Sequence, residues 1–156
     1  MRNVHAVDTI RRGKANEAAV LHAFIEAGWD VWTPFGDGGA YDLLAGWEDQ
    51  FLRVQCKSAR VRDGCLVFNT YATDHGRGRE TYEGRADVFG VSAPGLPNVY
   101  VVPIRAVAVS EGRLRLEPAA NNQRKKIRPA SAYAMERWEP EGLFACVEVD
   151  PLILIQ

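Results

Sequence analysis

The chain has no apolar run long enough to cross a bilayer. None of its 156 residues belongs to a hydrophobic stretch approaching the roughly 20 residues of a transmembrane helix, so no membrane association is predicted. The opening MRNVHAVDTIRRGK also lacks the apolar core of a secretory signal. With 47% hydrophobic and 25% charged residues, the composition is typical of a globular protein. We expect one domain over residues 1–156, in the cytoplasm and associated with the nucleoid.

Cysteine is scarce and several familiar site signatures are missing. Cys56, Cys65 and Cys146 are odd in number and show no metal-ligand spacing, so they are predicted to be reduced and mostly buried. The glycine-rich stretch GDGGAYD (36–42) lacks the Lys-Ser/Thr of a phosphate-binding loop. Neither a GxGxxG fingerprint nor a Ser-His-Asp order is present. These absences argue against a nucleotide-binding loop and against a serine-hydrolase site.

The net charge of −1 does not by itself indicate a nucleic-acid partner. The basic residues are nevertheless clustered along the chain, in four groups: Arg11, Arg12 and Lys14; Arg53, Lys57, Arg60 and Arg62; Arg77, Arg79 and Arg85; Arg124, Lys125, Lys126 and Arg128. Clustered cations form a phosphate-binding surface if folding brings them to one side. The alternative interpretation is that they are ordinary solvated faces.

Hydrophobic periodicity predicts a helix, then short strands, then a second helix. The helix spans 13–28, and its buried stripe is Ala18, Leu21, Phe24 and Ile25. Strands are predicted at 29–33, 41–46, 51–58, 66–70, 86–92, 99–103 and 114–116, and a closing helix at 130–138. Glycine and proline make 34–40 a loop, and 74–83 also reads as a loop. This order indicates an α/β or α+β sheet with helices packed on it.

Glu17 interrupts the apolar pattern of the predicted first helix. It precedes Leu21 by four residues and Phe24 by seven, so it shares the face that should be buried. A carboxylate there needs a hydrogen bond, an ion pair or a metal. The alternative is an acid in the first turn, favoured by the helix dipole.

The predicted hairpin gathers more polar side chains. Asp42 lies within the apolar strand YDLLAG, and in FLRVQCKS the residues Arg53, Gln55 and Lys57 alternate with apolar ones. A turn near 48–50 brings Asp42 opposite the neighbourhood of Gln55 and Lys57. These groups form either a functional site or an exposed polar face with a simple Asp–Lys cross-strand pair.

Together these segments resemble the PD-(D/E)xK nuclease superfamily. Glu17, then Asp42 in GDGGAYDLLAG, then Gln55 and Lys57 in RVQCKS follow its order. The resemblance is closest to the branch with Gln in place of the second acid, similar to a group I intron homing endonuclease. It extends through TYEGRADVFGVSAPGLPNVYVVPI and NNQRKKIRPASAY, and so covers about residues 13–133. It implies a restriction-endonuclease-like fold, a mixed β-sheet core flanked by helices.

The resemblance also implies a chemistry for these residues. Asp42 would be the main anionic ligand of Mg²⁺, for which Mn²⁺ substitutes, and the Gln55 side-chain oxygen and the Cys56 main-chain carbonyl would be further ligands. Lys57 would orient the attacking water and stabilise negative charge. Glu17 would act through a metal-bound water or a second metal position. A neutral Gln55 predicts weaker metal binding than a second carboxylate would give.

The implied function is metal-dependent hydrolysis of DNA phosphodiesters by a homing, restriction-like or junction-resolving endonuclease. Cutting both strands would require a homodimer or homotetramer. The expected phosphate contacts are Lys14, Arg60, Arg77 and Arg79, and the loop 74–83 also holds His75. Two alternatives remain: a catalytically weak or inactive nuclease-fold module that binds DNA, and a globular domain whose polar hairpin is merely exposed.

Overall fold

A computed structural model describes the chain except for residues 1–3, 37, 75–77, 119–120, 122–126 and 149–156. The elements, in chain order, are α1 (Val4–Glu26), β1 (Asp30–Trp32), β2 (Leu43–Trp47), β3 (Gln50–Ser58), β4 (Arg60–Arg62), β5 (Cys65–Asn69), β6 (Tyr71–Asp74), β7 (Gly78–Thr81), β8 (Val88–Ser92), β9 (Tyr100–Pro103), β10 (Glu111–Arg115) and α2 (Pro140–Glu148). Short 3-10 turns occupy Ile104–Ala106, Ala130–Ala132 and Met135–Arg137. No helix within the described residues combines the length and apolarity that a bilayer crossing needs.

The central layer is a five-stranded mixed sheet in the order β1-β2-β3-β8-β9. Only β3 and β8 pair in parallel; the other neighbours are antiparallel. A parallel pair needs a long crossover, and here the crossover carries the β4–β5 and β6–β7 hairpins. β10 joins β5 and β4 in a separate three-stranded sheet. The α/β prediction of a mixed sheet flanked by helices is confirmed.

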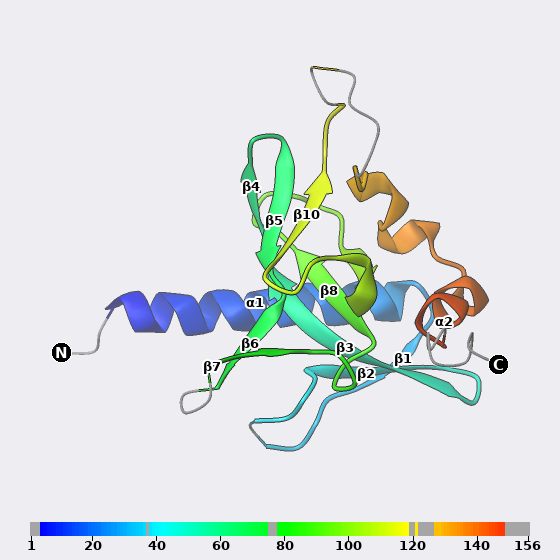
Figure 1. Ribbon diagram of the computed structural model, residues 1–156. Coiled ribbons are helices and arrows are strands. Elements are labelled where there is room, and N and C mark those ends of the chain that lie inside the picture. The colour runs from blue at the N-terminus through cyan, green and yellow to red at the C-terminus, as the bar shows by residue number, and fades with distance from the viewer. Residues whose placement is uncertain (1–3, 37, 75–77, 119–120, 122–126, 149–156) are drawn as a thin grey trace.

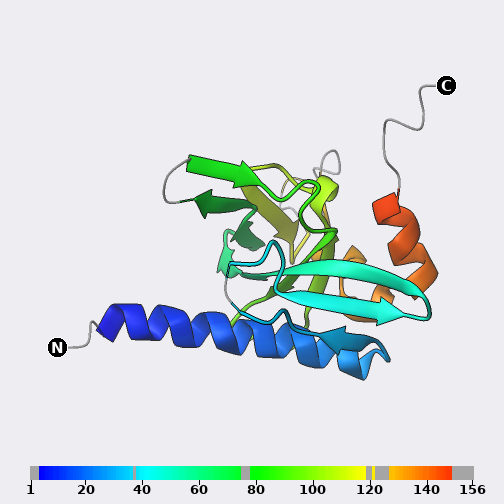
Figure 2. The same ribbon diagram turned by 90° about the horizontal axis from the view of Figure 1, so that it is seen from below.

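Two hydrophobic clusters cover the two faces of the central sheet. Val20 and Phe24 of α1 pack with Val54 of β3 and Leu143 of α2 on one face. On the other face, Phe89 of β8 packs among residues of β5, β9 and β10. Figure 1 shows α1 running across the sheet, and Figure 2 shows α1 and the β5–β10 layer on opposite sides of it. The alternation of β3 therefore sends odd and even residues into different surroundings.

α1 ends at a glycine with a left-handed backbone, as the sequence predicted. Gly28 has φ 90°, and its N–H and that of Trp29 donate to the carbonyls of Ile25 and Phe24. This pair of bonds is a Schellman motif, which satisfies two otherwise free helix carbonyls. The start was predicted wrongly, because the helix begins at Val4 rather than at residue 13.

The buried stripe of α1 also differs from the prediction. Its buried residues are Asn16, Val20 and Phe24, spaced four apart, whereas Ala18 and Ile25 are exposed. Alanines on both flanks of the stripe blurred the apolar periodicity, so the sequence did not single out the face that meets the sheet.

Several later elements depart from the predictions. β10 begins at Glu111 instead of residue 114, and β4 was not predicted. The predicted loop 74–83 is largely the β6–β7 hairpin. The closing helix lies at Pro140–Glu148, while 130–138 contains only 3-10 turns. Proline stands at helix position N1 of α2, where its missing N–H costs nothing.

Candidate active site

The site residues gather where the β2–β3 pairing stops. The ladder runs from Trp47↔Gln50 to Leu43↔Val54, so β3 continues past the end of β2. Asp42 immediately precedes β2 rather than lying within a strand as predicted, and its N–H donates to the Val54 carbonyl at 2.9 Å. The same register, extended by one residue, places Asp42 opposite Gln55. The predicted neighbourhood of Asp42 and Gln55 is therefore observed.

The Asp42 carboxylate is held at this open edge by two hydrogen bonds. The Gln55 side-chain Nε2 donates to Asp42 Oδ2 at 2.7 Å, and the Cys56 main-chain N–H donates to the same oxygen at 2.8 Å. Because N–H and C=O of one strand residue point to the same side, the Cys56 carbonyl also faces this edge. Burial raises the pKa of Asp42, and the Cys56 N–H and the Lys57 charge only partly offset that rise.

Glu17 approaches the same edge from α1. Glu17 is exposed, so it does not lie on the buried face as predicted. It also lies thirteen positions after Val4, so it is not an acid in the first turn of the helix. It lies on the flank of the buried stripe, next to Asn16. Partial burial and the nearby Asp42 charge both raise the pKa of Glu17, and Lys14 partly lowers it. Two carboxylates thus repel each other at the end of β2.

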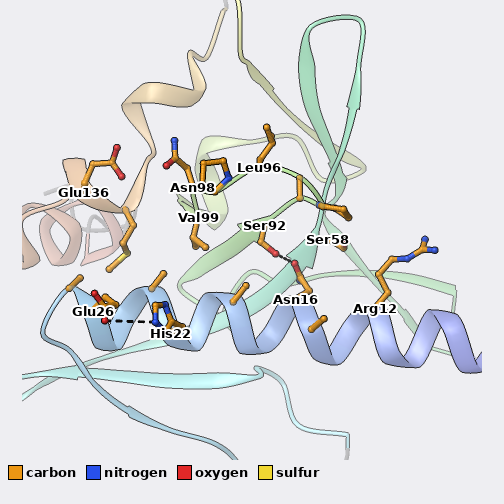
Figure 3. Close-up of a pocket in the computed structure, with 18 residues that line it drawn as sticks. Arg12, Asn16, His22, Glu26, Ser58, Ser92, Leu96, Asn98, Val99 and Glu136 are labelled. Atoms are coloured by element: carbon orange, nitrogen blue, oxygen red, sulfur yellow. Dashed lines mark hydrogen bonds and ion pairs between the residues drawn. The ribbon is translucent and has the colours of Figure 1, made fainter.

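A buried polar contact sets the position of α1 along the sheet. Asn16 and Ser92 are each 8% exposed, and the Ser92 hydroxyl donates to Asn16 Oδ1. Both residues line a hollow of about 660 Å³ along α1. Figure 3 shows the bond between them. At 100° per residue, the hollow and Glu17 lie on opposite flanks of α1. None of the four predicted site residues lines the hollow.

Lys57 shares its face of β3 with Gln55 but points toward the second layer. Its Nζ donates to Asn69 Oδ1 at 2.9 Å and lies over the Tyr82 ring at 4.5 Å. Burial lowers the pKa of Lys57 from 10.5 to about 8, and the Asp42 charge opposes that change. The ammonium is therefore poorly hydrated and within electrostatic reach of the carboxylate, which are useful properties for a group that acts on an anionic substrate.

The donor set suits a hard divalent cation. Glu17 and Asp42 offer carboxylate oxygens, and their mutual repulsion would be relieved by a bound cation. Burial and the charges of Asp42 and Glu17 strongly raise the pKa of Cys56, so its thiol stays protonated and its carbonyl is the available donor. No cluster of three or more His, Cys, Asp or Glu that could hold a metal occurs among the described residues, so the set depends on amide and main-chain oxygens.

Sequence reasoning missed the groups around Lys57 and the role of Arg53. Tyr82 and Asn69 come from outside the motif, and only the folded crossover places them beside the lysine. Arg53 was grouped with possible phosphate contacts, but it forms a 2.8 Å ion pair with Asp87. Asp87 Oδ2 also accepts from the Arg53 main-chain N–H at 2.7 Å, so the pair joins β3 to the start of β8.

Three of the four predicted DNA contacts lie within the described residues. Arg60 and Arg79 line a groove of about 1070 Å³ together with Arg12, and this basic groove also contains Asn69 and Tyr71 beside Lys57. Lys14 is exposed on α1 but does not line the groove. Arg77 and His75 lie outside the described residues. Arg62 is paired with Glu111, and Arg85 with Glu80.

The cysteines are free thiols. Cys56 and Cys65 are buried as predicted, but Cys146 is exposed near the end of α2, which contradicts the expectation that all three are mostly buried. None of the three side chains contributes to the group around Asp42.

Comparison with known proteins shows a match over most of the chain. The model of a family described as PD-(D/E)XK endonuclease matches residues 7–136. The solved structure of a bacterial homing endonuclease, I-Ssp6803I, is similar, with 25% sequence identity and a TM-score of 0.67 over 91% of this chain and 98% of that one. No curated protein matches the chain significantly. The likeness confirms the predicted restriction-endonuclease-like fold.

Proposed function

Because the chain belongs to the PD-(D/E)XK endonuclease family, we propose that it is a Mg²⁺-dependent DNA endonuclease that reacts at Glu17, Asp42, Gln55 and Lys57. The family is one of nucleases, whose members generally use divalent metals and act on DNA. The observation that carries the proposal is the meeting of Asp42, Gln55 and the Cys56 main chain at the open edge of β3. The single domain of residues 1–156 would hold the whole site.

Each residue has a role that its surroundings support. Asp42 and Glu17 would hold the cation with the Cys56 carbonyl and the Gln55 side-chain oxygen. Gln55 Nε2 donates to Asp42, so the amide would turn over to present its oxygen to a cation bound there. When bound, Mg²⁺ supplies Lewis-acid activation of water and charge neutralisation at the phosphate. Lys57 would orient the attacking water and stabilise the negative charge that develops on the phosphate oxygens.

Gln55 also limits how tightly the cation is held. A neutral amide contributes less attraction than a carboxylate, so we expect binding in the range of weak, water-retaining Mg²⁺ sites. We also propose that the chain belongs to the branch with Gln in place of the second acid, which Gln55 and Lys57 support. Arg12, Arg60 and Arg79 of the basic groove would contact the phosphates that lead to Lys57.

Cleavage of supercoiled and branched DNA with Mg²⁺, Mn²⁺ or EDTA tests the proposal. We expect cutting only with metal, and a loss of more than a hundredfold in Asp42→Ala and in Lys57→Ala. Cutting in EDTA, or full activity in either variant, would contradict the assignment. Light scattering on the DNA complex tests the expected homodimer or homotetramer, since one site cuts one strand.

The second candidate function is DNA binding without cleavage, which the neutral Gln55 favours. It is the correct one if the wild-type chain binds DNA with salt-dependent affinity but cuts no DNA topology with either metal. Absence of binding at low salt would leave only a globular domain with a polar hairpin.

A further inference from the structure

The ammonium of Lys57 is held by three acceptors from the layer above β3. Its Nζ donates to Asn69 Oδ1 at 2.9 Å, to the Tyr82 hydroxyl at 3.2 Å and to the Tyr71 main-chain carbonyl at 3.3 Å. A protonated lysine has three N–H donors, so these acceptors occupy all of them before DNA binds, and one bond is exchanged when Lys57 acts on water or phosphate. Lys57 is therefore fixed in one place although its side chain has four rotatable bonds.

The side chain of Tyr82, one of these acceptors, is fixed by its own packing. Its residue is 8% exposed, and its ring meets Phe89 edge-on, with centroids 5.7 Å apart. Its main-chain carbonyl accepts the N–H groups of Arg85 and Ala86 in the turn before β8. Because Phe89 lies beside Gln55 in the parallel register, Tyr82 is tied to the strand pair that carries the site.

The Tyr82 hydroxyl is also close to the other charged groups. It accepts a hydrogen bond from Lys57 Nζ. Burial raises the pKa of Tyr82, and the Asp42 charge raises it further. The hydroxyl therefore stays protonated at neutral pH and keeps its acceptor lone pairs for the lysine. The tyrosine side chain offers Lys57 both a hydrogen bond and the face of an aromatic ring.

We propose that Tyr82 is a positioning residue of the nuclease reaction, and that its hydroxyl holds the Lys57 ammonium where it acts on the scissile phosphate. This role rests on the proposed function. The hydroxyl restricts the rotation of the Lys57 side chain before DNA binds, so less conformational entropy is lost when the reaction takes place. Asn69 accepts from the same ammonium at 2.9 Å from β5 and shares the role.

Tyr82→Phe tests the proposal, because it removes the hydroxyl and keeps the ring that packs on Phe89. We expect kcat for DNA cleavage to fall about tenfold while KM changes less than twofold, since the bond affects the reacting state rather than DNA binding. Tyr133→Phe is the matched control: Tyr133 is partly buried against the same hydrophobic cluster as Tyr82 but does not line the basic groove, so kcat should stay within twofold of wild type.

A spectroscopic measurement shows where the lysine is. The chain has only four lysines, so the ε-methylene signals of ¹³C-labelled lysine are readily assigned, and the ring of Tyr82 should shift that of Lys57 upfield. In Tyr82→Phe the upfield shift of the Lys57 signal should decrease, because a less restrained ammonium spends less time over the ring. Asn69→Ala, at an exposed position, should lower kcat in the same direction and provides a second variant if Tyr82→Phe folds poorly.

Three results would overturn this role. If Tyr82→Phe keeps the wild-type kcat, the hydroxyl is structural. If kcat rises, the hydroxyl restrains Lys57 away from the substrate. If only KM changes, Tyr82 contributes to DNA binding instead. If the wild-type chain cuts no DNA, the proposed function itself is wrong. If the wild-type chain cuts DNA and Tyr82→Phe cuts equally well, only the role of Tyr82 is wrong.

Discussion

The Asp42 carboxylate is stabilised by hydrogen bonds and destabilised by burial. Two N–H groups donate to its Oδ2, yet burial raises its pKa, so ionisation at neutral pH costs folding free energy. A raised folded pKa means that the folded chain binds the proton more tightly, and stability falls as pH rises through the shifted pKa.

We therefore predict that Asp42→Asn abolishes cleavage while leaving the metal-free protein as stable as wild type or up to about 1 kcal/mol more stable at pH 7. The asparagine oxygen still accepts both hydrogen bonds but carries no charge. The measurements are DNA cleavage and urea unfolding, and Mg²⁺ should raise the Tm of wild type but not of the variant.

Asp63→Asn is the matched control for this prediction. Asp63 is exposed in the turn between β4 and β5 at φ 51°, a conformation that asparagine tolerates well. It should change neither cleavage nor the Mg²⁺-dependent rise in Tm. If Asp42→Asn unfolds at much lower denaturant, Asp42 is mainly structural.

Lys57 gives the chain a predictable pH dependence. Burial lowers its pKa from 10.5 to about 8, so between these values the unfolded chain binds a proton that the folded chain has released. Stability from this group is lowest below pH 8 and increases from pH 8 to about 10.5, by on the order of 2 kcal/mol after allowing for partial exposure. Lys57→Met should remove this increase.

Urea unfolding of the metal-free protein at pH 7, 8.5 and 10 measures this difference. Lys14→Met is the control, since Lys14 is exposed on α1 and its removal should leave the wild-type pH dependence intact. Equal pH dependence in wild type and Lys57→Met would contradict the prediction. Any other pH-dependent group cancels, because both proteins contain it.

At the scale of elements, the contact between α1 and β8 determines whether Glu17 reaches Asp42. Gly90 lies where the helix crosses the strand, and a Cβ there would stand 2.4 Å from Val20 Cγ1 and 3.1 Å from Val54 Cγ1. A side chain would push α1 away from the sheet. Because Glu17 precedes Val20 by less than one turn, such a shift would move it away from the open edge of β3.

Gly90→Ala should therefore lower both stability, by about 2 kcal/mol, and cleavage. Val20→Ala in the same chain should restore part of both by making room for the methyl group. Gly13→Ala is the control: it adds the same methyl to α1 where nothing lies within 4 Å, and it should not destabilise. An unchanged Gly90→Ala variant would show that α1 adjusts without affecting the site.

Elements with strong local signals were predicted well, and those defined by distant partners were not. Gly28 marks the end of α1, and the alternation in β3 separates buried Val54 from the polar site face. The β6–β7 hairpin and β4 were missed, since their short polar strands are stabilised by pairing within the crossover. In the 130–138 segment, helix-forming residues yield only 3-10 turns. The Tyr133 carbonyl accepts from the Val101 N–H of β9, and the Met135 N–H donates to the Val99 carbonyl just before β9.

For the whole molecule, we expect the distribution of paired and unpaired arginines to decide where DNA phosphates bind. Arg62 Nη2 is 3.4 Å from Glu111 Oε1, whereas Arg60 forms no ion pair within the described part of the chain. The two arginines lie on the same strand, two residues apart, and only Arg60 lines the basic groove. Neutralised arginines release fewer counterions from DNA than free ones do.

Arg60→Gln should weaken DNA binding and reduce the slope of log K against log salt by about 1, whereas Arg62→Gln should change the slope much less. Fluorescence anisotropy of a labelled duplex across a salt series, without divalent metal, gives both slopes. If Arg62→Gln has the larger effect, phosphates bind outside the basic groove. Both variants remove the same charge, so net charge alone does not explain a difference.

The sequence by itself determined the order of the chemistry-bearing residues and the strand alternation that puts Gln55 and Lys57 on one face. These are local properties, because side-chain direction in a strand and helix-ending glycines depend on neighbours in the chain. It also indicated Asp42 as their partner, since a short hairpin has few possible registers.

Only the tertiary structure decided what surrounds those residues. β2 begins only at Leu43, which leaves the edge of β3 beyond Val54 open for Glu17. The crossover places Asn69 and Tyr82 against the Lys57 ammonium, and Asp87 neutralises Arg53. These contacts join residues distant in the chain, and their energies depend on burial, which no local pattern contains. The sequence predicts Asp42 and Lys57 as reacting groups, and packing sets the pKa values of these residues and the directions in which they point.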